Sequence, residues 1–224
     1  MAAQWPIREV YAAPGLADAE TRGVLAAVAS AGVPVTELGD DAFRRAAYRS
    51  HPDGVLAVGR IPDTSLSRLE IVEGALVLVV EAIEKPGNLG AMLRTADGAG
   101  VDAVIAADPG VDPWNPNAVR ASQGALFSVP IAIADAAGTE AWLAGQAMRI
   151  VAAVPTDEGP SPWEVDLTGP VAIVVGSEHA GVSARWRAYQ SVRIPMTGRV
   201  DSLNASVAAA LLMYEGLRQR SQPR

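Results

Sequence analysis

Short apolar runs, separated by polar turns, recur along the whole chain. In the first part of the chain these runs alternate with segments of helical apolar spacing, which predicts a small α/β unit over residues 1–61. The predicted elements are strands within 7–15, 33–38 and 54–61, and helices within 16–32 and 40–50. Pro, Asp, Ser and Gly then follow in close succession at 62–74, which is typical of a linker.

A second α/β series begins at residue 75. Its apolar runs are continuous rather than alternating, as a parallel sheet covered on both faces requires. The predicted strands are 75–81, 103–107, 128–133, 149–154, 171–176 and 192–195, and the last predicted helix is 203–219. This alternation predicts a doubly wound parallel sheet over 75–224. Because ligands bind beyond the carboxyl ends of strands in such a sheet, the polar loops after the apolar runs are the places to search.

Composition narrows the classes of function. The chain contains no cysteine, which excludes a disulfide scaffold, a thiol nucleophile and a cysteine-ligated metal site, and we expect no bound metal. Because no apolar run reaches the roughly 18 residues of a membrane span and no signal layout opens the chain, we expect a cytoplasmic protein. The net charge of −7 disfavours non-specific nucleic-acid binding. Only Lys85 is a lysine among 18 basic residues; arginine favours bidentate phosphate contacts, although a compositional bias explains the same count.

The loop 81–100 follows a predicted strand directly. Asn88 is placed to cap the next helix, and Gly90 would leave open space beside the guanidinium of Arg94 one turn later. The structural alternative is a simple Asn cap with an ion pair between Arg94 and Asp97 at i, i+3. The loop lacks GxGxxG and the acidic partner of a dinucleotide site, so a nicotinamide-dependent enzyme is poorly supported.

A second polar loop follows the apolar strand 171–176. Gly176 and Gly181 would let the backbone approach a ligand closely, and Glu178 lies at the carboxyl end of the strand. The alternative is a tight turn with a solvated glutamate. His179 beside it is a possible general base, but a surface histidine without a partner is the simpler interpretation.

A third polar loop precedes the last apolar helix. Ser202 or Asp201 is expected to cap this helix, where unpaired N–H groups favour an anion or a carbonyl oxygen. Asn204 would then fall inside the first turn, where asparagine weakens a helix slightly. Capping therefore explains Ser202 and leaves Asn204 unexplained.

Together, the three loops resemble the signature motifs of the SpoU (TrmH) family of RNA ribose methyltransferases, within the SPOUT superfamily. The matching residues are Asn88, Gly90 and Arg94 in the first loop, Gly176, Glu178 and Gly181 in the second, and Ile194, Pro195, Met196, Ser202, Leu203 and Asn204 in the third. The segment 118–130 is similar to the Arg-x-Ser-x-Gly-Ala segment between the family's first two motifs. The resemblance covers about residues 75–219.

The N-terminal unit resembles the family only in part. Residues 48–58 are similar to the end of the family's substrate-binding domain, with Pro52-Asp53 where the family has glutamine. The strand and helix that open this domain in the family have no counterpart, so we expect a shortened RNA-binding domain over 1–61. The expected phosphate contacts are Arg44, Arg45, Arg49 and His51. The alternative is an ordinary charged helix face.

The resemblance implies a parallel-sheet methyltransferase domain over 75–224 whose C-terminal segment forms a trefoil knot. It implies that the knot binds S-adenosylmethionine through Gly176, Ile194, Met196 and Leu203, with main-chain groups in an apolar slot reading the adenine. The implied reaction is attack of a ribose 2′-hydroxyl on the sulfonium methyl group.

The resemblance also implies roles for five polar residues. Because arginine stays protonated in proteins, we expect Arg94 to hold the flanking phosphate and stabilise developing alkoxide charge rather than act as a base. We expect Asn88, Glu178, Ser202 and Asn204 to position the ribose and Arg94. The implied partners are a second copy of the chain, in a homodimer, and ribosomal or transfer RNA. The alternative is a dimeric module that binds S-adenosylmethionine without transferring its methyl group.

Overall fold

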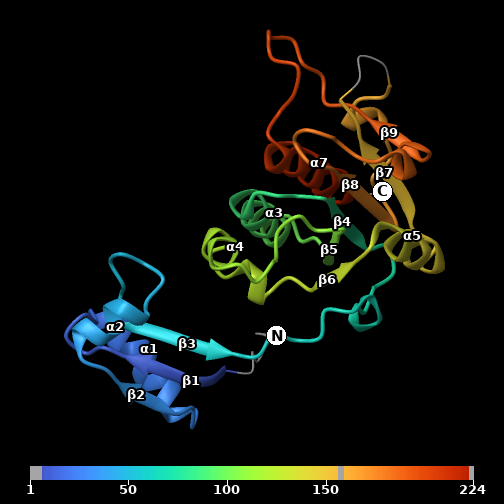
Figure 1. Ribbon diagram of the computed structural model, residues 1–224. Coiled ribbons are helices and arrows are strands. Elements are labelled where there is room, and N and C mark those ends of the chain that lie inside the picture. The colour runs from blue at the N-terminus through green and yellow to red at the C-terminus, as the bar shows by residue number, and fades with distance from the viewer. Residues whose placement is uncertain (1–6, 156–158, 222–224) are drawn as a thin grey trace. The chain divides into compact units, whose positions relative to one another are not determined.

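Three strands and two helices build the first of the two units into which the chain divides, and this unit ends at Pro62. The computed structural model describes residues 7–155 and 159–221 and is drawn in Figure 1. The elements of the first unit are β1 (Ile7–Ala12), α1 (Ala19–Ser30), β2 (Val35–Glu37), α2 (Asp40–Ala46) and β3 (Val55–Gly59). β1 lies in the middle of the sheet, parallel to β2 and antiparallel to β3. The predicted alternation of strands and helices is therefore present.

Six parallel strands form the sheet of the second unit, which begins at Asp63. In order across the sheet they are β6 (Ile131–Ala134), β5 (Ala103–Ala107), β4 (Leu76–Glu81), β8 (Val171–Val175), β7 (Arg149–Ala153) and β9 (Gln190–Val192). All neighbouring strands pair in parallel. β4, β5 and β8 are buried along their whole length. The parallel sheet predicted from continuous apolar runs is confirmed, because only strands covered on both faces need such runs.

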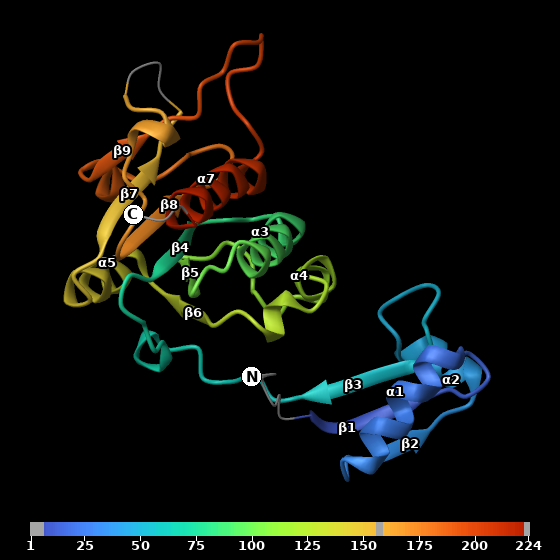
Figure 2. The same cartoon turned by 180° about the vertical axis from the view of Figure 1, so that it is seen from behind.

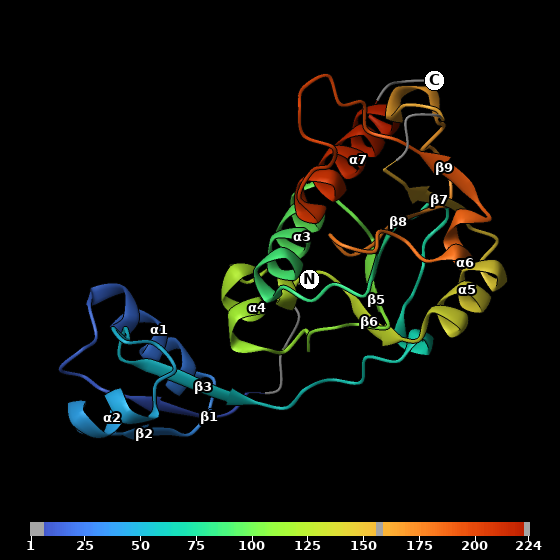
Figure 3. The same ribbon diagram turned by 45° about the horizontal axis from the view of Figure 1, so that its top comes forward.

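Helices cover both faces of this sheet (Figures 2 and 3). On one face α3 (Pro86–Gly98) and α7 (Ala205–Arg220) pack side by side, and α4 (Pro116–Ala121) packs on α3. On the other face lie α5 (Ala136–Gly145) and α6 (Ala184–Arg187). The 3₁₀ turns are η1 (Leu66–Arg68), η2 (Ala125–Phe127) and η3 (Pro162–Glu164). Within the described residues, no helix is both long enough and apolar enough to span a membrane.

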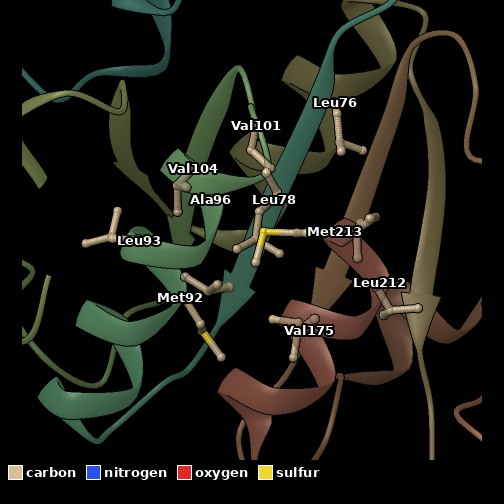
Figure 4. Packing of buried hydrophobic residues seen from close by; sticks show 14 of the residues in the cluster. Leu76, Leu78, Met92, Leu93, Ala96, Val101, Val104, Val175, Leu212 and Met213 are labelled. Atoms are coloured by element: carbon tan, nitrogen blue, oxygen red, sulfur yellow. The ribbon is translucent and has the colours of Figure 1, made fainter. Parts of the chain in front are cut away.

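Successive residues of β4 point to opposite faces and so divide the core in two. Leu78 faces α3 and α7 in a cluster with Met92 and Met213, and Figure 4 shows these three side chains together. The next residue, Val79, faces the other side and belongs to the cluster that contains Leu143 of α5. Because β4 contributes side chains to both clusters, packing on both faces of the sheet fixes its position.

The segment 62–74, predicted as a linker, packs against the second unit over much of its length. Leu66, Leu69 and Ile71 lie against the core cluster on the α5 side. The carbonyl of Thr64 accepts a hydrogen bond from the N–H of Ile133 at 2.8 Å. These apolar side chains, interspersed with polar ones, cover an edge of the sheet face rather than form a free connection.

Glu140 ties α5 to the segment that contains α6. Its carboxylate accepts a hydrogen bond from the hydroxyl of Tyr189 at 2.6 Å and a second one from Arg185. The Tyr189 hydroxyl, followed by Arg185, holds the pKa of Glu140 below its usual range, while the same carboxylate raises the pKa of Tyr189. The short helix α6 is therefore held in place both by the contacts with Glu140 and by the buried side chain of Trp186.

Arg220, in the last turn of α7, binds main-chain carbonyls at the amino ends of β4 and β8. Its Nε donates to Leu167 at 2.9 Å, one terminal nitrogen donates to Gly169 at 2.5 Å and, more weakly, to Ala75 at 3.5 Å, and the other donates to Gly74. Burial lowers the pKa of Arg220, but the group stays charged because arginine titrates far above neutral pH. One guanidinium thus fixes the end of the last helix to the start of two central strands.

We expect Arg220→Met to lower the free energy of unfolding by about 2 kcal/mol, because hydrogen bonds from a charged donor to partly buried carbonyls are lost. Urea denaturation followed by circular dichroism measures this difference. Arg218→Met is the matched control, because Arg218 lies on the same helix and, among the residues that the structure describes, pairs only with Glu215. Equal stability of the two variants would contradict the role given to Arg220.

Candidate functional site

The order of the strands sets the place of the site. From β4 the chain runs outward through β5 and β6 on one side, and it fills the other side with β7, β8 and β9. This change of direction leaves the carboxyl ends of β4 and β8 next to each other, where open α/β sheets bind ligands. Two of the three polar loops follow these two strands, and the third ends at the start of α7. The backbone leaves β4 through Ala82 in a left-handed conformation, with φ of 52°, which L-residues adopt only at a cost in free energy.

A cavity of about 500 Å³ lies at this edge of the sheet, which is within the usual size of small-molecule sites. Its walls come from the ends of β7 and β8, the loop after β8, the segment before α7 and the first turn of α7. The four residues predicted to bind the cofactor are all among its lining: Gly176, Ile194, Met196 and Leu203. Val154 also lines the cavity, although no motif indicated it.

The charged groups of the cavity lining are mixed. Glu178 and Asp201 are acidic, and Arg187 is basic. An apolar slot with two carboxylates fits S-adenosylmethionine, which joins a flat adenine ring to a cationic sulfonium centre. Within residues 7–155 and 159–221, no group of three His, Asp or Glu side chains could hold a metal ion.

A chain of two hydrogen bonds joins the three polar loops. Nδ2 of Asn204 donates to Oδ1 of Asn88 at 3.1 Å, and Nδ2 of Asn88 donates to Oε1 of Glu178. These partners are 116 and 90 residues apart in the sequence. Because Glu178 also lines the cavity, the chain of amides forms a polar surface at its edge.

Asn204, and not Ser202 or Asp201, caps α7. Its Oδ1 accepts from the N–H of Ser206 at 2.9 Å and from the Ser206 hydroxyl at 2.6 Å. The prediction that Asn204 lies inside the first turn is wrong, because α7 begins at Ala205 rather than at 203. Asn204 therefore starts the helix with its side-chain oxygen and reaches Asn88 with its nitrogen.

Asn88 does not cap α3, contrary to the prediction. The helix begins at Pro86, and Lys85 occupies the N-cap position without a side-chain capping bond. Proline suits the first helical position because its φ is fixed and it has no N–H to satisfy, so the helix starts before Asn88. This leaves the Asn88 amide available for the other two loops.

Packing within the chain requires two of the three motif glycines, Gly90 and Gly176. A Cβ at Gly90 would lie 2.5 Å from the Cβ of Ala121. The space predicted beside Arg94 is thus filled by α4, which packs directly on α3. A Cβ at Gly176 would lie 2.0 Å from the carbonyl oxygen of Gly181, so the loop after β8 folds back onto the end of its own strand.

Arg94 and Ser202 lie outside the chain of hydrogen bonds. Arg94 is exposed on α3 and makes no hydrogen bond or ion pair with the residues that the structure describes. Asp97, its expected alternative partner, accepts instead from the hydroxyl of Ser128 at 2.7 Å. Ser202 is exposed and lines the cavity. The structure thus leaves both side chains available to a ligand.

Lys85 is a site residue that motif reasoning missed. Its Nζ lies 3.9 Å from Oε1 of Glu178, the oxygen that also accepts from Asn88. The Lys85 side chain is 64% exposed and that of Glu178 is 16% exposed. The lysine therefore brings a solvated positive charge to the edge of the site. The feature of the sequence that could have indicated this role is that Lys85 is the only lysine in an arginine-rich chain.

The predicted RNA contacts lie together in the first unit. Arg44 and Arg45 are exposed in the last turn of α2. Arg49 forms an ion pair with Asp53, and Nδ1 of His51 lies 3.2 Å from a neighbouring serine hydroxyl. Since an exposed ion pair contributes little stability, Arg49 can exchange Asp53 for another anion.

The double role of Asn204 can be separated by substitution. We expect Asn204→Ala to lower the free energy of unfolding by about 1–2 kcal/mol, because both the cap and the bond to Asn88 are lost. We expect Asn204→Ser to recover most of the capping contribution, because a serine hydroxyl caps a helix but is too short to reach Asn88. Urea denaturation of the two variants measures this. If serine destabilises as much as alanine does, capping is not what Asn204 supplies.

Comparison with known sequences shows extensive similarity to one group of enzymes. Residues 75–214 match the profile of the SpoU rRNA Methylase family. The 23S rRNA (uridine(2479)-2'-O)-methyltransferase of Streptomyces viridochromogenes is 35% identical in an alignment of 176 positions that covers 75% of this chain and 61% of that relative's length. The 23S rRNA (guanosine-2'-O-)-methyltransferase RlmB of Bordetella pertussis is 36% identical in an alignment of 230 positions that covers 96% of this chain and 90% of that protein.

Solved structures share the fold. The SpoU methyltransferase AviRb from Streptomyces viridochromogenes, in complex with the cofactor AdoMet, has a TM-score of 0.85 and 28% identity, covering 97% of this chain and 84% of that one. A structure described as an RNA 2'-O ribose methyltransferase has a TM-score of 0.82 and 39% identity, covering 97% of this chain and 83% of that one. The similarity extends through nearly all of the chain, including the first unit.

Proposed function

The chain belongs to the SpoU rRNA methylase family, and we propose that it transfers the methyl group of S-adenosylmethionine to a ribose 2′-hydroxyl of 23S ribosomal RNA. The observation that carries this function is the hydrogen-bonded chain of Asn204, Asn88 and Glu178 beside the cavity, because it brings the three motifs to one place. The relatives described above are named 23S rRNA 2′-O-methyltransferases. One acts on a uridine and the other on a guanosine, so the RNA and the ribose hydroxyl are what they share. The comparisons give no support to a binding module without methyl transfer.

The cavity is the proposed cofactor site. When bound, S-adenosylmethionine supplies an electrophilic methyl group on a sulfonium centre. Gly176, Ile194, Met196 and Leu203 would hold the adenine and methionine parts through apolar contact and main-chain polar groups. Enclosure between these walls would exclude water from the reacting groups.

The five polar residues have two tasks in this proposal. Asn88, Asn204 and Glu178 hold one another and present amide and carboxylate groups at the cavity's edge, where they would orient the ribose. Ser202, in the cavity wall, would contribute a hydroxyl to the same surface. Arg94 would hold the phosphate next to the target ribose and stabilise negative charge as it develops on the 2′-oxygen. An exposed guanidinium without a partner among the described residues suits that task.

The first unit is the proposed RNA-binding domain. Arg44 and Arg45 are exposed side by side at the end of α2, and Arg49 and His51 follow within the next turn of chain. Such a cluster can contact phosphates even in a chain with a net charge of −7, because local convergence of cations matters more than the sum. A cytoplasmic site of action belongs to the same proposal, since ribosomal RNA is found there.

Homodimerisation and a trefoil knot complete the proposal. Val207, Leu211 and Tyr214 recur at i, i+4 and i+7 on α7 and are 46%, 47% and 50% exposed, which is unusual for an apolar stripe on a monomer. A second copy of the chain packed on this stripe would bring its own site residues close to Arg94 on the neighbouring helix α3. The knot would lie in the C-terminal segment, which runs from β8 past β9 and returns to place Asn204 beside Asn88.

The activity is tested with tritiated S-adenosylmethionine and purified RNAs. We expect label in 23S ribosomal RNA and none in transfer RNA, at a nucleotide whose 3′ phosphodiester bond becomes resistant to alkaline cleavage. We expect Arg94→Ala to lower kcat by about 100-fold or more with the dissociation constant of the cofactor unchanged, because it removes a charge that acts mainly in the transition state. Arg68→Ala is the matched control, because Arg68 is exposed on η1 on the opposite face of the sheet. Wild-type protein that binds the cofactor but labels no RNA would overturn the proposal.

The dimer is tested independently of activity. We expect the wild-type protein to have the mass of two chains by light scattering, and Leu211→Arg to have the mass of one, because a buried unpaired charge is not tolerated in an apolar interface. Leu25→Arg on α1 of the first unit is a control for the added charge. A monomeric wild-type protein contradicts the dimer without bearing on the fold.

A further inference from the structure

The loop 177–183 after β8 forms one wall of the cavity and carries Glu178. The loop closes on itself, because the N–H of Gly181 donates to the carbonyl of Ser177 at 2.9 Å and the N–H of Ala180 lies 3.3 Å from the Ser177 hydroxyl. These bonds fix the shape of the turn but not its position relative to α3, where Asn88 lies. Two side chains outside the loop supply that position.

Glu81 is the first of these side chains. It is the last residue of β4 and is only 5% exposed. Its Oε2 accepts a hydrogen bond from the N–H of Ser183 at 2.7 Å, and it forms no ion pair within the part of the chain that the structure describes. A buried carboxylate is costly to keep, so its retention at the carboxyl end of the central strand calls for a gain elsewhere. That gain is the attachment of the end of the loop to β4, the strand that precedes α3 in the chain.

Arg187 is the second. From the last position of α6, its Nε donates to the carbonyl of Val182 at 2.9 Å and a terminal nitrogen donates to the carbonyl of Ala180 at 3.3 Å. Arg187 also lines the cavity. Because α6 is itself anchored through Trp186 in the core, the guanidinium connects the loop to a second fixed element, in addition to β4.

We propose that Glu81 and Arg187 are positioning residues for methyl transfer, which attach the loop 177–183 to β4 and to α6 so that Glu178 meets Asn88 and the cavity wall stays in place. This inference rests on the proposed function of the site. Between them the two side chains bind three main-chain groups of one loop, at residues 180, 182 and 183. Neither side chain is required to touch the ribose.

The test compares substitutions that keep or remove the contacts. Glu81→Gln retains an oxygen that accepts from Ser183, whereas Glu81→Leu has a similar volume and no acceptor. We expect the dissociation constant of S-adenosylmethionine, measured by calorimetry, to stay within about twofold for the glutamine variant and to rise about tenfold for the leucine variant, as the loss of one buried hydrogen bond implies. We expect Arg187→Met to behave like Glu81→Leu, and Arg187→Lys, with one nitrogen for two carbonyls, to lie between.

The control for a merely structural effect is Arg220→Met. Arg220 also binds main-chain carbonyls, but at the amino ends of β4 and β8, away from the cavity. We expect all apolar variants to lower Tm, and only those at Glu81 and Arg187 to raise the cofactor's dissociation constant and to lower kcat at saturating cofactor and RNA. Binding and rates are measured at a temperature where circular dichroism shows each variant folded.

The outcomes separate this inference from the function on which it rests. If wild-type protein is active and Arg187→Met changes only Tm, as Arg220→Met does, the positioning role is wrong. Because Arg187 is exposed, that variant decides the matter even if Glu81→Leu fails to fold. If wild-type protein itself transfers no methyl group while binding the cofactor with the expected differences among variants, the proposed function fails and the positioning of the cavity wall stands.

Discussion

Two side-chain amides connect parts of the chain that are 116 and 90 residues apart, as Asn204 donates to Asn88 and Asn88 donates to Glu178. Each amide lies at the start of a helix, and the carboxylate lies in the loop that follows a buried strand. The bonds are possible only because β4 and β8 are neighbours in the sheet, which brings their carboxyl ends together. The hydrogen bonds among these three side chains therefore depend on the strand order, and they connect the start of α7 to the edge of the cavity.

The sequence predicted the sheet well because burial on both faces leaves a strong signal. The strand 103–107 has the bounds that its apolar run indicates, and β4 and β8 begin within one residue of the prediction. The edge strand β9 is displaced, covering Gln190–Val192 where 192–195 was predicted. An edge strand pairs on one side only, so its register depends on β7 rather than on its own composition.

The candidate site was predictable as a set of residues but not as a set of contacts. A shift of two residues in the start of α7 converts Asn204 from an unfavourable residue into the cap. From the sequence alone, Gly90 predicts open space, whereas in the structure glycine is required there because Ala121 of another helix packs against it. Glu81 reads as the last residue of a strand, because nothing local indicates that a loop 102 residues later binds its carboxylate. These roles depend on which elements become neighbours, and periodicity does not contain that information.

The chain carries a single lysine, and it stands 3.9 Å from the carboxylate of Glu178 with 64% of its side chain exposed. Apart from the α-amino group, Lys85 is therefore the one primary amine open to acylating reagents. Ordinary amine chemistry would place a fluorophore or a nuclear spin label at the rim of the cavity without any engineered residue. The native protein thus carries its own reporter position for events at this edge of the sheet.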